Sequence, residues 1–131
     1  MKKMRIATMV SAHFTIPPPE GIVYAPMDIA RWVAEGLVAR GHTVDFFAPE
    51  GSSVKVSRMV SLGLKALKQG DAILKYSKVG NAEINKIFNL WDQYLVAEMF
   101  KTARNGDYDI LHIHPIDRAL SIALSHPDVP T

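Results

Sequence analysis

Cysteine is absent from the sequence, which excludes disulfide bonds and thiolate metal sites and suits a chain that works in the reducing cytoplasm. No apolar run approaches the roughly 18 residues that argue for a membrane-spanning helix. Residues 1–5 are basic, but the apolar stretch that follows them is too short for a secretory signal. We therefore expect a cytoplasmic location, with the inner face of the membrane as an alternative that the charge pattern below suggests.

The sequence also lacks a Gly-x-Gly-x-x-Gly motif after its first apolar segment. Glu50 stands where dinucleotide enzymes hold a ribose, yet no phosphate-binding loop accompanies it, so a dinucleotide-dependent dehydrogenase is not expected. Aromatic residues make up 8% of the chain and are nearly absent from its most basic stretch. This scarcity argues against a nucleic acid partner, because single strands are bound by stacking their bases on aromatic rings.

What is present is an ordinary globular composition: 131 residues, 48% hydrophobic and 21% charged, which suits one domain. Residues 51–80 suggest short helices rather than strands, and residues 128–131 resemble the opening of a further strand. The apolar periodicity predicts strands at 5–10, 43–48 and 108–114, and helices at 27–40, from 81 to the Asn105-Gly106 pair, and after an N-cap at Asp117.

These elements predict an α/β fold, a Rossmann-like parallel sheet with helices on both faces. The first strand is nearly all apolar, as expected of a parallel strand buried on both faces, and the next two elements complete a βαβ unit. Trp32 and Trp91 lie beside or on the apolar stripes of their helices and are expected to pack in the core. Three predicted strands leave an unpaired sheet edge, so we expect residues 1–131 to be a truncated amino-terminal domain of a larger protein.

His114 is the foremost candidate for a functional side chain, because it ends an apolar strand where the chain turns toward a helix. The carboxyl ends of parallel strands border the crevice where ligands bind, so its ring is expected to face a ligand. A structural role at the strand end is the alternative. His112 shares its strand face and is expected to pack within the sheet; the pair lacks an evident third ligand, so we expect no metal site. Asp107 and Asp109 form an Asp-x-Asp pair before the strand, where we expect a solvated turn.

Four segments occur in an order and spacing that resemble a known family. They read Met-Val-Ser-Ala-His-Phe with Ile-Pro-Pro-Pro-Glu-Gly, then Ala-Glu-Gly-Leu-Val-Ala-Arg-Gly-His-Thr-Val, then Phe-Ala-Pro-Glu-Gly-Ser, and finally Asp-Ile-Leu-His-Ile-His-Pro. Over about residues 5–50 and 81–131, the chain resembles the amino-terminal, acceptor-side domain of family 4 glycosyltransferases, which are retaining enzymes of GT-B fold. The resemblance implies that the chain is an incomplete half of a GT-B fold.

The resemblance further implies a two-domain enzyme that moves a sugar from a nucleoside-diphosphate sugar to an acceptor, with retention at the anomeric carbon. This chain would be the acceptor half, inactive alone, while a missing carboxyl-terminal domain would hold the nucleotide sugar; no cofactor is implied. His114 matches the family histidine beside the transferring sugar and is the implied catalytic residue, orienting the reactants. The residues implied to bind the acceptor or the donor sugar are His13, Glu20, Gly21 and Asp117.

The loop of residues 11–26 departs from the family in one respect. The family commonly has a Gly-Gly pair here, whose backbone amides approach a diphosphate, whereas this loop has Gly21 alone and Pro26 has no amide hydrogen. A second class of function therefore stays open. It is a non-catalytic α/β module that binds a small ligand or a partner at the same strand ends.

Positive charge is concentrated between Lys55 and Lys86, where seven Lys or Arg residues stand against two acidic residues. Such a patch attracts phosphates on an anionic membrane surface, and the interleaved leucines at 62, 64 and 67 would supply an apolar side. A solvated basic face is the alternative. The residues of this predicted anionic-surface patch are Lys55, Arg58, Lys65, Lys68, Lys75 and Lys78.

Overall fold

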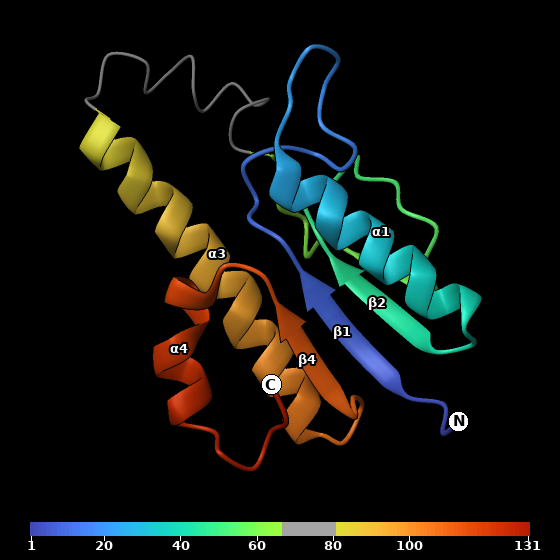
Figure 1. The fold of residues 1–131 in the computed structure, drawn as a ribbon. Helices are drawn as coiled ribbons and strands as arrows, with labels where there is room; N and C mark the ends of the chain where they lie inside the picture. Colours follow the sequence, from blue (N-terminus) through green and yellow to red (C-terminus); the bar gives the residue numbers. More distant parts are fainter. Residues whose placement is uncertain (67–80) are drawn as a thin grey trace.

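The computed structural model describes residues 1–66 and 81–131, which form one sheet with helices packed against it (Figure 1). The Rossmann-like α/β class predicted from the sequence is confirmed. The elements in chain order are β1 (Arg5–Met9), α1 (Ala25–Ala39), β2 (Thr43–Phe47), β3 (Arg58–Val60), α3 (Asn81–Arg104), β4 (Ile110–Ile113) and α4 (Ile116–Leu124).

The sheet is parallel throughout, with strand order β3-β2-β1-β4. β1 lies at its centre, and Ile6 is in register with Val44 of β2 on one side and with Ile110 of β4 on the other. Because β1 and β4 run parallel and in register, their carboxyl ends finish at the same edge of the sheet. That edge is where the sequence places its candidate site.

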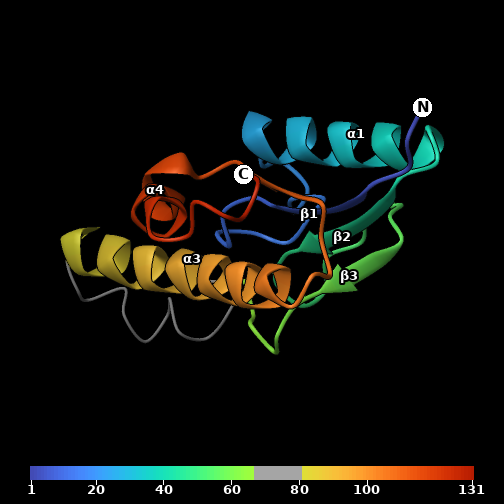
Figure 2. The same cartoon turned by 90° about the horizontal axis from the view of Figure 1, so that it is seen from below.

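Alternating side chains of the strands feed two separate cores. In β1, Ile6 points toward the layer of α1, while Ala7 and Met9 point toward the layer of α3 and α4. Figure 2 shows α1 on one side of the sheet and α3 on the other. A parallel strand covered by helices on both faces has no solvent-facing side, which is why its sequence reads as one apolar run rather than an alternating one.

The two longer helices begin and end where the residue types predict. α1 has Pro26 in its first turn, and Gly41, just beyond its end, has a φ of +86° that favours glycine. α3 buries Phe88, Leu95 and Met99 on one face, as the apolar stripe predicts, and Gly106, two residues beyond its end, has a φ of +79°. The predicted helix positions are therefore close to the observed ones.

Three predictions about secondary structure are wrong. Residues 58–60 form a strand, not a short helix: this edge strand is too short for its periodicity to be recognised, and pairing with β2 determines its conformation. Asp117 lies within the first turn of α4 and is not its N-cap, since the helix begins one residue after Pro115. The segment 128–131 forms no strand, although the Leu111 amide donates to the carbonyl oxygen of Pro130 at 2.9 Å.

Trp32 is also placed differently from its prediction. Its side chain is 65% exposed, on the outer side of α1, because the helix turns its buried face, with Ala30 and Ala34, toward the sheet. Trp91 is half-buried on α3.

Asp109 is in the expected turn before β4, where its carboxylate accepts a hydrogen bond from the Arg5 amide at 2.7 Å. In the described part of the chain, no helix has the length and apolarity to cross a bilayer.

A polar cluster in the α3 layer connects β2, β3 and the segment that precedes β4. The carboxylate of Asp45, on β2, is 8% exposed and accepts hydrogen bonds from the Tyr108 hydroxyl at 2.7 Å and from Arg58 Nη2 at 2.5 Å. Burial and the neighbouring Asp45 carboxylate raise the pKa of Tyr108 to about 12. The hydroxyl therefore remains protonated and donating across the ordinary pH range.

We expect Tyr108→Phe to lower the free energy of unfolding by about 1.5–3 kcal/mol at pH 8, because a hydrogen bond to a charged carboxylate is lost. The unfolded chain releases the tyrosine proton near its ordinary pKa of about 10, before the folded chain does. The stabilising effect is therefore complete below pH 10 and is lost toward pH 12, so the variant and the wild type should converge over that range. Urea unfolding measures this, with Tyr94→Phe, at an exposed site, as the control; equal effects of the two variants would contradict it.

Candidate functional site

A cavity of about 230 Å³ opens at the carboxyl ends of β1 and β4, which lie side by side in Figure 1. Residues that follow both strands line it, together with the starts of α1 and α4. His114 and the proline-rich loop after β1 thus border the same cavity, as the sequence predicts. The lining residues are Val10, Ser11, His13, Tyr24, Pro26, His114, Pro115, Asp117 and Arg118.

His114 is held at the cavity by the sheet. Its backbone amide donates to the carbonyl oxygen of Met9 at 3.2 Å, one step beyond the last register pair of β1 and β4. Its ring is half-buried and lies 4.5 Å, between centroids, from the ring of His112, which is exposed on the same strand face. The buried Nε2 atom of His114 has no hydrogen-bond partner in the structure, so it can serve a ligand.

Burial lowers the pKa of His114 from its ordinary value, and the nearby His112 lowers it further. The imidazole is therefore neutral at pH 7, with one nitrogen that donates and one that accepts. A neutral ring of this kind binds hydroxyl groups, which also both donate and accept.

Aromatic contacts position the second histidine of the cavity. The ring of His13 lies 4.2 Å from that of Phe88 on α3 and 6.1 Å from that of Tyr24, just before α1. These contacts fix the loop after β1 between the two helix layers. His13 and Tyr24 consequently line the same cavity as His114 and the start of α4.

A buried carboxylate holds the start of the same loop, next to His13. Asp92 of α3 is fully buried and accepts hydrogen bonds from the Ser11 hydroxyl and the Ala12 amide, each at 2.8 Å. The Nε atom of Arg118, in α4, lies 3.7 Å from the same carboxylate. Burial raises the pKa of Asp92, while the Ala12 amide, the Ser11 hydroxyl and the charge of Arg118 oppose that rise.

Charge within the cavity is balanced. Arg118 is the one Lys or Arg among the lining residues, and it faces two carboxylates, buried Asp92 and exposed Asp117. The hydrogen bond from Arg118 lowers the pKa of Asp117, so that side chain is ionised at neutral pH. With its cation already paired and His114 neutral, the cavity favours an uncharged, hydroxyl-bearing ligand over an anion.

The remaining residues predicted for sugar binding lie outside the cavity. Glu20 and Gly21 are exposed at the outer turn of the loop after β1. Gly21 has a φ of +81°, and a Cβ added there would meet no atom within 4 Å. The glycine therefore serves the turn of the backbone and does not make room for a close approach between backbone and neighbouring atoms.

The predicted anionic-surface patch is only partly within the described residues. Lys55 and Lys65 are exposed, whereas Arg58 is paired with Asp45 and its charge is largely offset there. Asp45 is buried, and a buried carboxylate needs a partner, which Arg58 provides. The sequence alone did not indicate this pairing. The patch residues that lie outside the described part of the chain are Lys68, Lys75 and Lys78.

Sequence reasoning missed Asp92, Arg118, Tyr24 and Ser11. The available signal was Asp92 itself, a carboxylate four residues after Phe88 and three before Leu95, hence beside the apolar stripe of the long helix. Among the side chains that the structure describes, no three His, Asp or Glu residues gather closely enough to hold a metal ion.

The sequence matches no protein-family model and none of the curated proteins. The cavity supplies a neutral imidazole, a carboxylate, a phenolic hydroxyl and a guanidinium within one small volume at the sheet edge.

We expect Asp92→Ala to lower the free energy of unfolding by about 3–5 kcal/mol, because Arg118 loses a buried counter-charge and two donors lose their acceptor. Urea unfolding measures the loss, and hydrogen exchange of the Ala12 amide should accelerate beyond the global change. Asp107→Ala, at an exposed turn, is the control. A loss below about 1 kcal/mol, within the range of exposed ion pairs, would show that the carboxylate does not hold the loop.

We expect His114 to titrate below its ordinary pKa of 6.5, and His112→Gln to move the midpoint of His114 upward. The unfolded chain takes up this proton first as the pH falls, so His114 should cost stability below pH 6.5. Ring-proton shifts measured by NMR give the midpoints, and His114→Gln should reduce the loss of stability in acid. A His114 midpoint at or above 6.5 would contradict the burial of the ring.

Proposed function

We propose that this chain is the acceptor-side half of a retaining glycosyltransferase, and that the cavity beside His114 receives the sugar or the acceptor hydroxyl during transfer. One observation carries the proposal: the histidine that matches the family's cleft residue borders the same cavity as the loop after β1. A histidine with a merely structural role at the strand end would not need to face that loop.

The size of the cavity supports a half-site. Small-molecule pockets usually measure about 300–1,000 Å³, and this one is about 230 Å³. It suits a single sugar ring better than a whole nucleotide sugar. The nucleotide would then be held by a second domain, as the resemblance implies.

The chemistry of the lining supports a hydroxylated ligand. His114 Nε2, the Tyr24 hydroxyl and the Asp117 carboxylate offer both donors and acceptors from three different segments. Holding a hydroxyl group from several sides fixes its direction, and orientation of reactants is a large part of rate enhancement in group transfer. His114 would orient the sugar or the attacking hydroxyl in the complete enzyme.

The proposal is tested with the 131-residue chain and four probes: UDP-glucose, UDP-N-acetylglucosamine, GDP-mannose and methyl α-glucoside. We expect at least one of them to shift the backbone amides of Ser11, His13, His114 and Arg118 saturably in the millimolar range. His114→Ala should weaken that binding by about fivefold, the effect of losing one hydrogen bond. Amide NMR spectra recorded along each titration give the affinities.

His112→Ala is the matched control, because it removes the neighbouring ring on the same strand face without changing a lining residue. It should bind the probe as the wild type does. Matched melting curves separate loss of binding from loss of folding. The proposal fails if no probe moves the lining amides, or if His114→Ala binds equally well; a response to inorganic phosphate alone would also count against it and favour a non-catalytic module.

A further inference from the structure

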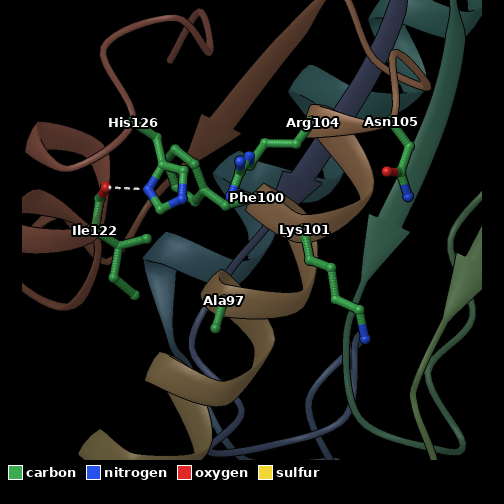
Figure 3. Close-up of a pocket in the computed structure, with 7 residues that line it drawn as sticks. All are labelled: Ala97, Phe100, Lys101, Arg104, Asn105, Ile122 and His126. Atoms are coloured by element: carbon green, nitrogen blue, oxygen red, sulfur yellow. Dashed lines mark hydrogen bonds between the residues drawn. The ribbon is translucent and has the colours of Figure 1, made fainter.

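A second cavity, of about 380 Å³, lies between the end of α3 and the end of α4 (Figure 3). α3 ends shortly before β4 begins, so this cavity lies toward the amino-terminal edge of the sheet, whereas His114 lies at the carboxyl-terminal edge. The two cavities share no lining residue. The residues that line the second cavity are Ala97, Phe100, Lys101, Arg104, Asn105, Ile122 and His126.

One side of this cavity is apolar and rigidly held. Phe100 is buried, and its ring lies 5.4 Å from the ring of His126. The Nδ1 atom of His126 is 2.9 Å from the carbonyl oxygen of Ile122 and must donate there, because a carbonyl oxygen can only accept. The imidazole is thereby held beside Phe100, as Figure 3 shows, with its plane tilted by 44° from that of the phenyl ring. The two rings and Ile122 give this wall of the cavity its apolar character.

The other side carries an uncommitted guanidinium. In the described residues, Arg104 is the one arginine whose side chain has neither a hydrogen bond nor an ion pair. Figure 3 shows Arg104 directed toward Phe100 and His126, while Lys101 points away from them. The other described arginines are engaged: Arg5 with Asp109, Arg31 with Glu35, Arg40 with the Gly36 carbonyl, Arg58 with Asp45 and Arg118 with Asp117.

No carboxylate lines this cavity, in contrast to the cavity of His114. Lys101 adds a second positive charge at the rim, and its weak pairing with Glu98, at 3.6 Å, leaves its side chain 74% exposed. The planar fork of a guanidinium binds phosphate and carboxylate groups through two parallel hydrogen bonds. Excess positive charge, a free fork and an apolar surface thus occur together.

We propose that this second cavity binds an oxyanion that carries an apolar group, with the oxyanion on Arg104 and the apolar group on Phe100, Ile122 and His126. Organic phosphate monoesters have this chemistry, whether they are free in solution or form the headgroup of a lipid. The site is independent of the proposed sugar transfer, because it lies elsewhere on the chain and is built from other residues.

Phenyl phosphate is the first probe, with inorganic phosphate and benzyl alcohol as its anionic and apolar halves. We expect phenyl phosphate to shift the Arg104 Nε–H, the Ile122 methyl groups and the His126 ring saturably, and to bind more tightly than either half. Arg104→Gln should weaken its binding about tenfold. Arg104→Lys keeps the charge but loses the fork, so it should bind less tightly than the wild type.

Arg40→Gln is the matched control, since it removes one positive charge at the carboxyl end of another helix, where Arg40 is the C-cap residue of α1. It should leave the affinity for phenyl phosphate unchanged. The proposal is overturned if phenyl phosphate leaves the three reporter groups unmoved, or if Arg40→Gln weakens binding as much as Arg104→Gln does. Melting curves show whether each variant is folded.

Vesicles distinguish the two sources of the ligand. Co-sedimentation with phosphatidic acid vesicles, but not with phosphatidylcholine vesicles, that is abolished by Arg104→Gln supports the proposal and assigns a lipid headgroup. Binding of phenyl phosphate without sedimentation supports it and assigns a free phosphate ester. Sedimentation that Arg104→Gln does not change, with no binding of phenyl phosphate, rejects the site.

Discussion

The candidate site depends on the carboxylate of Asp92. It joins the loop after β1, the middle of α3 and the first turn of α4. The longest of these connections in sequence, from Ser11 to Asp92, joins residues about 80 positions apart. A fully buried carboxylate is costly to desolvate, and here two hydrogen bonds and a nearby guanidinium offset that cost. Because the bonds are directional, they hold the loop in one position against the helices. The cavity has a defined shape only while they are made.

The register of the sheet determines which side chain meets that loop. β1 and β4 pair from Ile6 with Ile110 to Met9 with Ile113, and the His114 amide continues the ladder by one bond. Side chains alternate along β4, so Leu111 and Ile113 fill the core beneath α3, while His114 takes the other face. If β4 paired with β1 one residue out of this register, His114 would be buried against α3 and an isoleucine would face the cavity. The functional geometry therefore follows from the same alternation that builds the core.

The sequence predicted those parts of the fold that local pattern determines. β1, β2, α1 and α3 have long apolar runs or stripes, with Pro26, Gly41 and Gly106 at the expected ends. The placement of His114 follows from its position at the carboxyl end of a parallel strand. β3 was missed because three residues carry no period. Asp92 and Arg118 were missed because their roles arise only when distant segments meet, and Trp32 was misplaced because being beside an apolar stripe does not determine which way a side chain turns.

α3 contributes residues to both cavities, but the two sets of residues are far enough apart for their effects on free energy to be independent. Phe88 and Asp92 support the first cavity, whereas Phe100 and Arg104 line the second, and between them Leu95, Val96 and Met99 are buried against the sheet. Asp92 and Arg104 are 12 residues apart on the helix, which is about 18 Å at its usual rise. Residues that far apart, without a shared partner, act additively as a rule. The balanced charge of one cavity and the excess positive charge of the other can therefore select different ligands on a single small domain, without either site constraining the other.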